Sequence, residues 1–187
     1  MATMDSTFAR SSAYERRSGA VTALSLVQLA VGYEWLVSGL SKVANGDFAP
    51  RLASQLSELA SHASPWYGSL LRSAVVPHAL AFGYLIELTE LAAGFVLVGV
   101  AVAELAAGAR ITPRARRRLQ RLAVTALIAG ILMLANFELA NGGTFGLRLA
   151  SDSFDEGVDL DTMMIATQLA LLVALVPAFR RNPASGH

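Results

Sequence analysis

Four stretches of the chain are apolar over the length that a helix needs to cross a bilayer. They cover residues 20–43, 79–103, 122–141 and 161–179. A transmembrane helix requires about 20 mostly apolar residues, and inside lipid such a stretch must satisfy its own backbone hydrogen bonds, which a helix does. The sequence therefore predicts an all-α fold, an integral membrane four-helix bundle whose transmembrane domain spans residues 20–179.

The composition agrees with a chain that is largely shielded from water. Hydrophobic residues make up 54% of the 187 residues and charged residues only 16%, whereas a soluble domain carries about 25% charged residues. The length fits a single domain. The absence of cysteine excludes disulfides, iron–sulfur ligation and thiolate metal sites.

The basic residues predict the orientation of the four spans. Positively charged residues near spans accumulate on the cytoplasmic side. Eleven of the fifteen Lys and Arg residues fall on one side if the chain crosses four times: Arg10, Arg16, Arg17, Arg110, Arg114, Arg116, Arg117, Arg118, Arg121, Arg180 and Arg181. We therefore expect a cytoplasmic N-terminal segment at 1–19, a cytoplasmic loop at 110–121 and a cytoplasmic tail at 180–187, so that both termini are cytoplasmic in a multi-pass protein of the plasma membrane.

Two other interpretations of these charged segments are less favoured. The first span has the position of a signal peptide, but Glu34 and Lys42 interrupt it and it is long for the apolar region of a signal. The basic run at 114–121 has the composition of a nucleic-acid-binding segment. Its place between two spans favours contact with anionic lipid headgroups instead, and we expect no nucleic-acid partner.

The first extracytoplasmic loop, at 44–78, is predicted to contain short helices. Leu52, Leu56 and Leu59 share one helical face, and Pro50 suits the first turn of a helix. We expect one or two short helices that lie on the outer end of the bundle. The second extracytoplasmic loop, at 142–160, is glycine-rich and acidic.

Ionisable residues inside the spans are the candidate functional residues, because charge at membrane depth is expensive and needs a partner, a cavity or a neutralising proton. Four carboxyls from three spans fall at overlapping depths in the outer half, and we expect them to converge in one pocket as catalytic groups. They are Glu34, Glu87, Glu90 and Glu138, and the polar residues expected to bind substrate beside them are Ser38, Lys42, Asn136 and Asn141.

Such a pocket suits a quinone, since a protonated carboxyl donates a hydrogen bond to a quinone carbonyl and exchanges a proton with it. The alternative is a structural role, in which Glu34–Lys42 and Glu–Asn pairs tie the helices together. A di-metal site is a further alternative, but di-iron bundles use Glu-x-x-His and no span contains histidine. We expect no metal.

Two segments of the chain resemble a known family. Residues 31–43 read VGYEWLVSGLSKV and residues 84–100 read YLIELTELAAGFVLVGV. They resemble the first two helices of DoxX/DoxD-like four-helix membrane proteins, which carry a Ser-Gly-x-x-Lys segment and a Glu-x-x-x-Gly segment. The matching positions here are Ser38, Gly39, Lys42, Glu90 and Gly94, and the resemblance extends over about residues 21–176.

The resemblance implies a membrane subunit of a redox complex, of the type of a thiosulfate:quinone oxidoreductase. With no cysteine and no haem or flavin motif, the chain is at most one subunit of such an enzyme, with quinone as its candidate cofactor and no covalently bound group. Its partners would be the lipid bilayer and the other subunits. The alternatives are a non-catalytic structural or assembly subunit that anchors a larger complex, and a small transporter, which the lack of inverted repeats disfavours.

Overall fold

A computed structural model describes residues 3–142 and 160–180, and the side chains of 19–108, 110–142 and 160–176. Most of the second expected outer loop, including Arg148, and residues 181–187 of the expected tail lie outside the described residues. The described part is helical and contains no strand, so the prediction of an all-α fold is confirmed for it.

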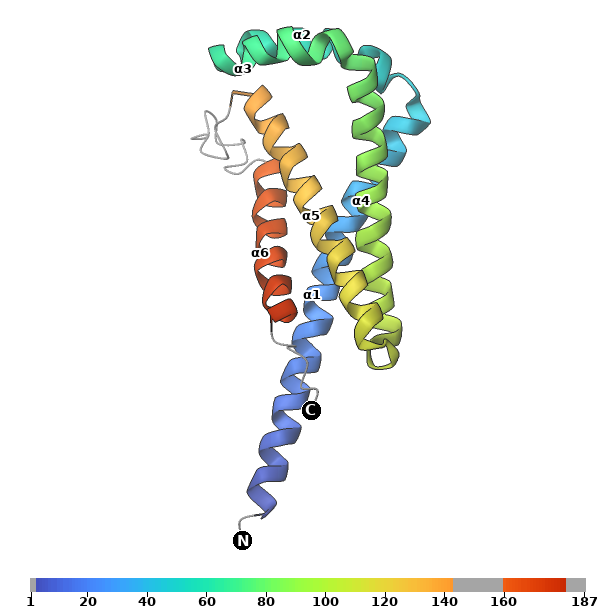
Figure 1. The fold of residues 1–187 in the computed structure, drawn as a ribbon, viewed down its shortest axis with the longest axis vertical. Helices are drawn as coiled ribbons and strands as arrows, with labels where there is room; N and C mark the ends of the chain where they lie inside the picture. Colours follow the sequence, from blue (N-terminus) through green and yellow to red (C-terminus); the bar gives the residue numbers. More distant parts are fainter. Residues whose placement is uncertain (1–2, 143–159, 181–187) are drawn as a thin grey trace, which may run out of the picture.

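The described residues form four long helices, and shorter helices lie across one end of them (Figure 1). The long helices are α1 (Thr3–Asn45), α4 (Ala79–Ala107), α5 (Pro113–Ala140) and α6 (Leu160–Arg180). Between α1 and α4 come α2 (Phe48–His62), α3 (Pro65–Leu70), the π-helical turn η1 (Leu71–Val75) and the 3₁₀ turn η2 (Val76–His78). A further 3₁₀ turn, η3 (Gly108–Arg110), follows α4.

Within the part of the chain that the structure describes, three helical segments are long and apolar enough to cross a membrane: Gly19–Asn45, Pro65–Ala107 and Pro113–Ala140. The chain is therefore a membrane protein by the length and composition of its helices. The apolar part of α6, Leu160–Val176, is shorter.

Helices α1 and α4 approach each other closely because glycines lie at their contact. A Cβ at Gly94 would lie 2.7 Å from the Cα of Leu36, and a Cβ at Gly39 would lie 2.9 Å from the backbone nitrogen of Leu91. Real side chains do not tolerate such distances. Small residues of this kind let membrane helices pack backbone to backbone, since lipid offers little hydrophobic drive for helix association.

The apolar core lies where α1, α4, α5 and α6 face one another. Its largest fully buried side chains are Leu97, Leu127 and Leu171, each 0–2% exposed. They come from α4, α5 and α6, and Trp35 of α1 joins the same cluster. All four long helices therefore pack as one bundle.

The short helices cover one end of this bundle, as the sequence predicts for the first outer loop. Leu52 is buried and Leu56 and Leu59 are half-buried, on the face of α2 that packs inward. The hydroxyl of Tyr67 in α3 donates a hydrogen bond of 2.9 Å to Oδ1 of Asn136 in α5. Arg72 donates to the carbonyl oxygen of Ala60 at 2.8 Å, which ties η1 to α2.

Two expected boundaries differ from the structure. The expected N-terminal segment at 1–19 and the first span form a single helix, α1, which begins at Thr3 and extends well beyond the other helices (Figure 1). The run at 110–121 is not a loop, because α5 begins at Pro113 and its arginines occupy the first turns of that helix. Thr112 caps this start by accepting a hydrogen bond from the backbone of Ala115, and proline suits the first helical position.

The start of α5 is held to the end of α4 by an ion pair. Nε of Arg116 lies 3.1 Å from Oε1 of Glu104, and the same guanidinium donates to the carbonyl oxygen of Gly108. Glu104, near the end of α4, therefore faces the arginines at the start of α5.

Candidate functional site

The centre of the polar site is an ion pair between α1 and α4. Nζ of Lys42 lies 2.8 Å from Oε1 and 2.7 Å from Oε2 of Glu90, and it also donates to Oγ of Ser38 at 2.7 Å. Ser38 in turn donates to Oε2 of Glu90 at 3.1 Å. Lys42, Ser38 and Glu90, which we call the Lys42–Glu90 cluster, thus form a closed set of hydrogen bonds.

The two ends of this pair differ in their access to solvent or lipid. The side chain of Glu90 is 1% exposed and that of Lys42 is 20% exposed. A carboxylate so deeply buried needs a counter-charge. Lys42 supplies it from the last turn of α1, where its long side chain reaches back along the helix. The lysine also lies 5.2 Å above the ring of Phe48 at the start of α2.

Glu34 does not join this cluster. Its side chain is exposed on α1, outside the contact with α4, so the expected convergence of four carboxyls does not extend to it. The reason is helix geometry, because residues four apart are rotated by about 40° from each other. Over the two steps from Glu34 to Lys42 the rotation is about 80°, enough to leave Glu34 outside while Ser38 and Lys42 face α4.

Glu87 lies one turn from Glu90 on the same face of α4, as expected. It is 7% exposed, and within the described part of the chain no hydrogen bond or ion pair reaches its carboxyl. Its oxygens are not among the fully buried polar atoms that lack a partner in the described chain, so the carboxyl keeps some contact with the surroundings of the helix. Glu87 is therefore the buried acid of α4 that the structure leaves available for another molecule.

The expected site residues of α5 do not join the Lys42–Glu90 cluster. Glu138 is 4% exposed and accepts a hydrogen bond of 3.3 Å from the hydroxyl of Thr162 in α6. Asn136 binds Tyr67 and donates to the carbonyl oxygen of Leu132. Asn141 is exposed at the end of α5. The carboxyls thus serve different helix contacts, Glu90 that of α1 with α4 and Glu138 that of α5 with α6.

The structure adds a buried polar contact that the sequence analysis missed. Nε1 of Trp35 lies 3.4 Å from Oε1 of Gln168, and Gln168 is 0% exposed. Gly130 makes room for both, since a Cβ there would lie 3.0 Å from the Trp35 ring. The Nε2 atom of Gln168 has no hydrogen-bond partner among the described residues. The signal in the sequence was the position of Gln168 inside an apolar span, where a polar side chain needs a partner.

A second buried amide joins α1 to α4. Nε2 of Gln28 donates to the carbonyl oxygen of Leu97 at 2.9 Å. It is a second polar contact along the α1–α4 interface, besides the Lys42–Glu90 cluster. Among the described residues, no three histidine, aspartate or glutamate side chains gather as metal ligands would.

The arrangement favours helix association over chemistry at Glu90 and Glu138, whose oxygens already have partners inside the bundle. Of the four expected carboxyls, Glu34 and Glu87 are the two to which no described residue offers a hydrogen bond or a charge. Comparison of the chain with protein-family models, with curated proteins and with solved structures finds no match.

Proposed function

We propose that this chain is a structural or assembly subunit of a larger membrane complex. It crosses the plasma membrane four times, with α6 as the fourth span and both termini in the cytoplasm. The distribution of arginines supports this orientation. The polar contacts of Glu90, Glu138 and Gln28, each between two helices, support a role in holding the bundle together.

The observation that carries the proposal is the exposed carboxyl of Glu34. It lies within the apolar segment Gly19–Asn45, eleven residues before the helix end, or about 16 Å along the axis. In a hydrocarbon core about 30 Å thick, that depth is near the centre. A carboxyl facing lipid there is costly, and such groups pair with other polar groups. A helix of another subunit supplies that partner.

Replacement of Glu34 tests the proposal. The chain is purified from its native membrane with its partners, as parent, Glu34→Leu and Ser41→Leu. Because Glu34 contacts no described polar residue, Glu34→Leu keeps the fold but loses the co-purifying partner. Ser41 is exposed on the same side of α1, so Ser41→Leu controls for added apolar surface and retains the partner.

If Glu34→Leu co-purifies with the same proteins in the same amounts as the parent, Glu34 binds no partner helix and the proposed subunit role is wrong. A raised melting temperature in that variant, without loss of any partner, would show that Glu34 is merely a tolerated surface charge.

A second candidate function rests on Glu87. A buried carboxyl without a partner in the described chain suits hydrogen bonding to a quinone, in line with the redox role that the DoxX/DoxD resemblance implies. In this function the chain is a quinone-interacting subunit of an oxidoreductase, and the electrons come from another subunit. Ser38 and Lys42 then act only by holding Glu90 in place, one turn away.

Quinone retention separates the two functions. Extraction of the purified native complex yields about one quinone per chain from the parent if Glu87 binds it, and much less from Glu87→Leu. Glu58→Leu, at an exposed position of α2, is the matched control and retains it. Equal quinone content in all three samples would rule out the quinone function and leave the structural one.

A further inference from the structure

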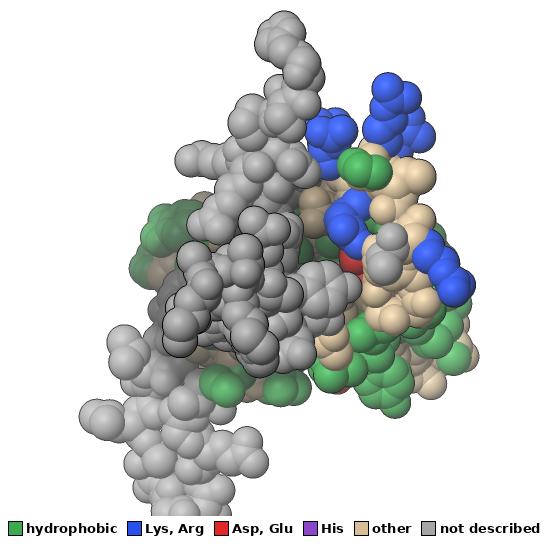
Figure 2. Space-filling view, turned by 90° about the horizontal axis from the view of Figure 1, so that it is seen from below, with side chains coloured by type: hydrophobic (Ala, Val, Ile, Leu, Met, Phe, Trp, Pro, Cys, Tyr) green, Lys and Arg blue, Asp and Glu red, His purple; other side chains and the backbone are tan. Residues whose placement is uncertain are grey.

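A row of residues on α5 begins with two arginines and ends with two apolar residues. Arg114, Arg118, Leu122 and Ala126 follow one another at four-residue spacing, about 6 Å apart. Each step turns by about 40° around α5, so the row runs from the exposed arginines to Leu122 and Ala126, which face the space between α4 and α5. Both arginines are exposed, and no described residue forms an ion pair with them. Figure 2 shows basic side chains gathered at this end of the molecule, beside apolar ones.

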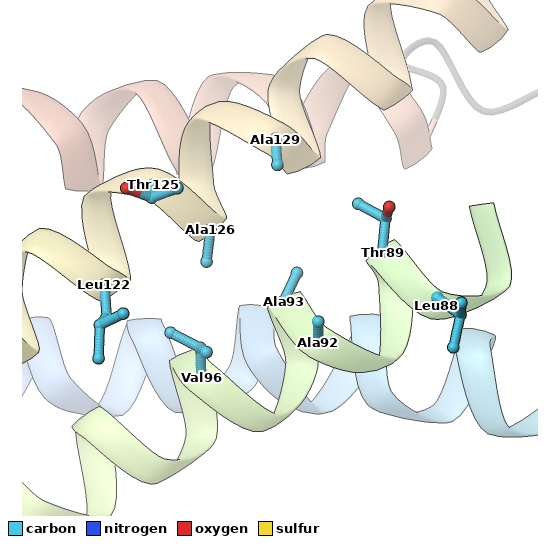
Figure 3. Close-up of a pocket in the computed structure, with 9 residues that line it drawn as sticks. All are labelled: Leu88, Thr89, Ala92, Ala93, Val96, Leu122, Thr125, Ala126 and Ala129. Carbon is cyan, nitrogen blue, oxygen red and sulfur yellow. The ribbon is translucent and has the colours of Figure 1, made fainter. Parts of the chain in front are cut away.

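The apolar end of this row opens into a groove between α4 and α5. The groove has a volume of about 290 Å³ and is open on one side rather than enclosed. Its lining is apolar apart from two threonines: Leu88, Thr89, Ala92, Ala93, Val96, Leu122, Thr125, Ala126 and Ala129 (Figure 3). Alanines from both helices leave the space, because their side chains are too short to fill it.

The arginines point away from the bundle. The buried side of α5 carries Ala123, Leu127 and Leu134, whereas the side that continues the arginines carries Leu122, 52% exposed, and Leu132, 60% exposed. That exposed apolar side faces lipid in a membrane-spanning helix. Its arginines therefore lie at the level of the headgroups, where a cation meets phosphate.

We propose that this surface binds one anionic phospholipid, with the phosphate at Arg114 and Arg118 and one acyl chain in the α4–α5 groove. From Leu122 to Ala129 the groove follows α5 for about 10 Å, most of one leaflet of a hydrocarbon core about 30 Å thick. Positive charge at the mouth and an apolar channel along the span match the two parts of such a lipid.

Two neighbouring arginines provide an internal comparison. Arg116 is occupied by Glu104 and Gly108. Arg117 is exposed but lies about 100° around the helix from Arg118, on the side away from Leu122 and Ala126. Arg118 and Arg117 thus carry the same charge at nearly the same depth, and only Arg118 is in line with the groove.

Native mass spectrometry of the full chain tests the proposal. Delipidated protein in detergent is titrated with dioleoyl phosphatidylglycerol, with dioleoyl phosphatidylcholine, and with glycerol phosphate as a headgroup without chains. One phosphatidylglycerol binds, phosphatidylcholine binds more weakly, and glycerol phosphate does not compete. Arg118→Gln weakens phosphatidylglycerol binding about fivefold, the effect of one interfacial arginine, whereas Arg118→Lys and Arg117→Gln stay within about twofold of the parent.

Filling the groove tests the acyl-chain half of the proposal. Ala92→Leu with Ala129→Leu abolishes the one-lipid adduct, while Ala170→Leu, at an exposed position of α6, retains it. Equal losses in Arg117→Gln and Arg118→Gln would mean diffuse attraction by the basic surface and overturn the site. Unchanged lipid binding after the groove is filled would overturn the proposal in favour of a surface that binds the headgroup alone. Unchanged lipid binding with a changed oligomeric state would overturn it in favour of a helix docked in the groove.

Discussion

At the scale of single residues, the contact between Lys42 and Glu90 is the most consequential in the described part of the chain. Glu90 is 1% exposed and depends on the lysine for its counter-charge. A buried ion pair adds little net stability relative to an apolar pair, but removal of one partner leaves the other charge buried without compensation. The same residues that make the site polar therefore also make it intolerant of single changes.

We expect Lys42→Met to destabilise the protein by about 3–5 kcal/mol, because Glu90 is then buried without a cation. The double variant with Glu90→Gln recovers most of that loss. Denaturation in mixed micelles, followed by circular dichroism, measures both. Arg51→Gln is the control, since its pair with Asp47 is exposed on both sides and contributes about 0–1 kcal/mol. Additive effects of the two buried substitutions would contradict this account.

At the scale of helices, much of the architecture was predictable, because a helix that crosses a bilayer appears in the sequence as an apolar stretch of about 20 residues. The expected spans at 79–103 and 161–179 fall inside α4 and α6. Boundaries outside the membrane were not predictable in this way. Residues 3–18 and the arginines of α5 are polar helical turns, and hydropathy does not separate a polar helix from a loop. The cap at Thr112 and Pro113 was the signal for the start of α5.

The partners of the polar residues were harder to predict than the helices. Glu34 and Lys42 lie two four-residue steps apart in one span, and their opposite charges made them a candidate pair. The structure pairs Lys42 with Glu90 instead, because the rotation of the helix places Glu34 outside the contact between α1 and α4. Gln168 and Trp35 are 133 residues apart, and no local pattern indicates that they meet.

We expect glycine substitutions on α4 to distinguish packed from open positions. Gly94→Ala places a Cβ against the backbone of Leu36 and costs about 1–3 kcal/mol by overpacking. Gly99 has nothing within 4 Å of the position that a Cβ would take, so Gly99→Ala is neutral or slightly stabilising through its better helix propensity. Thermal unfolding in detergent compares the two. Equal melting temperatures would mean that α1 and α4 do not approach as closely as described.

At the scale of the whole molecule, the orientation in the membrane is open to a direct test, because the chain contains no cysteine. A single cysteine is introduced in α2, as Ser57→Cys, or at the start of α5, as Ala115→Cys. Both positions are exposed. With four spans and cytoplasmic termini, an impermeant maleimide labels Ser57→Cys on intact cells and labels Ala115→Cys only after permeabilisation. Labelling of both from one side would contradict the four-span topology.

The Lys42–Glu90 pair also constrains how the protein is made. Lys42 leaves the ribosome 48 residues before Glu90, an interval of roughly 2–10 s at the usual rate of synthesis. During that time the lysine has no counter-ion, and its helix gains little by entering lipid alone. We expect the first helix to wait at the insertion channel until α4 arrives, so that the two are released into the bilayer with Lys42 and Glu90 already paired.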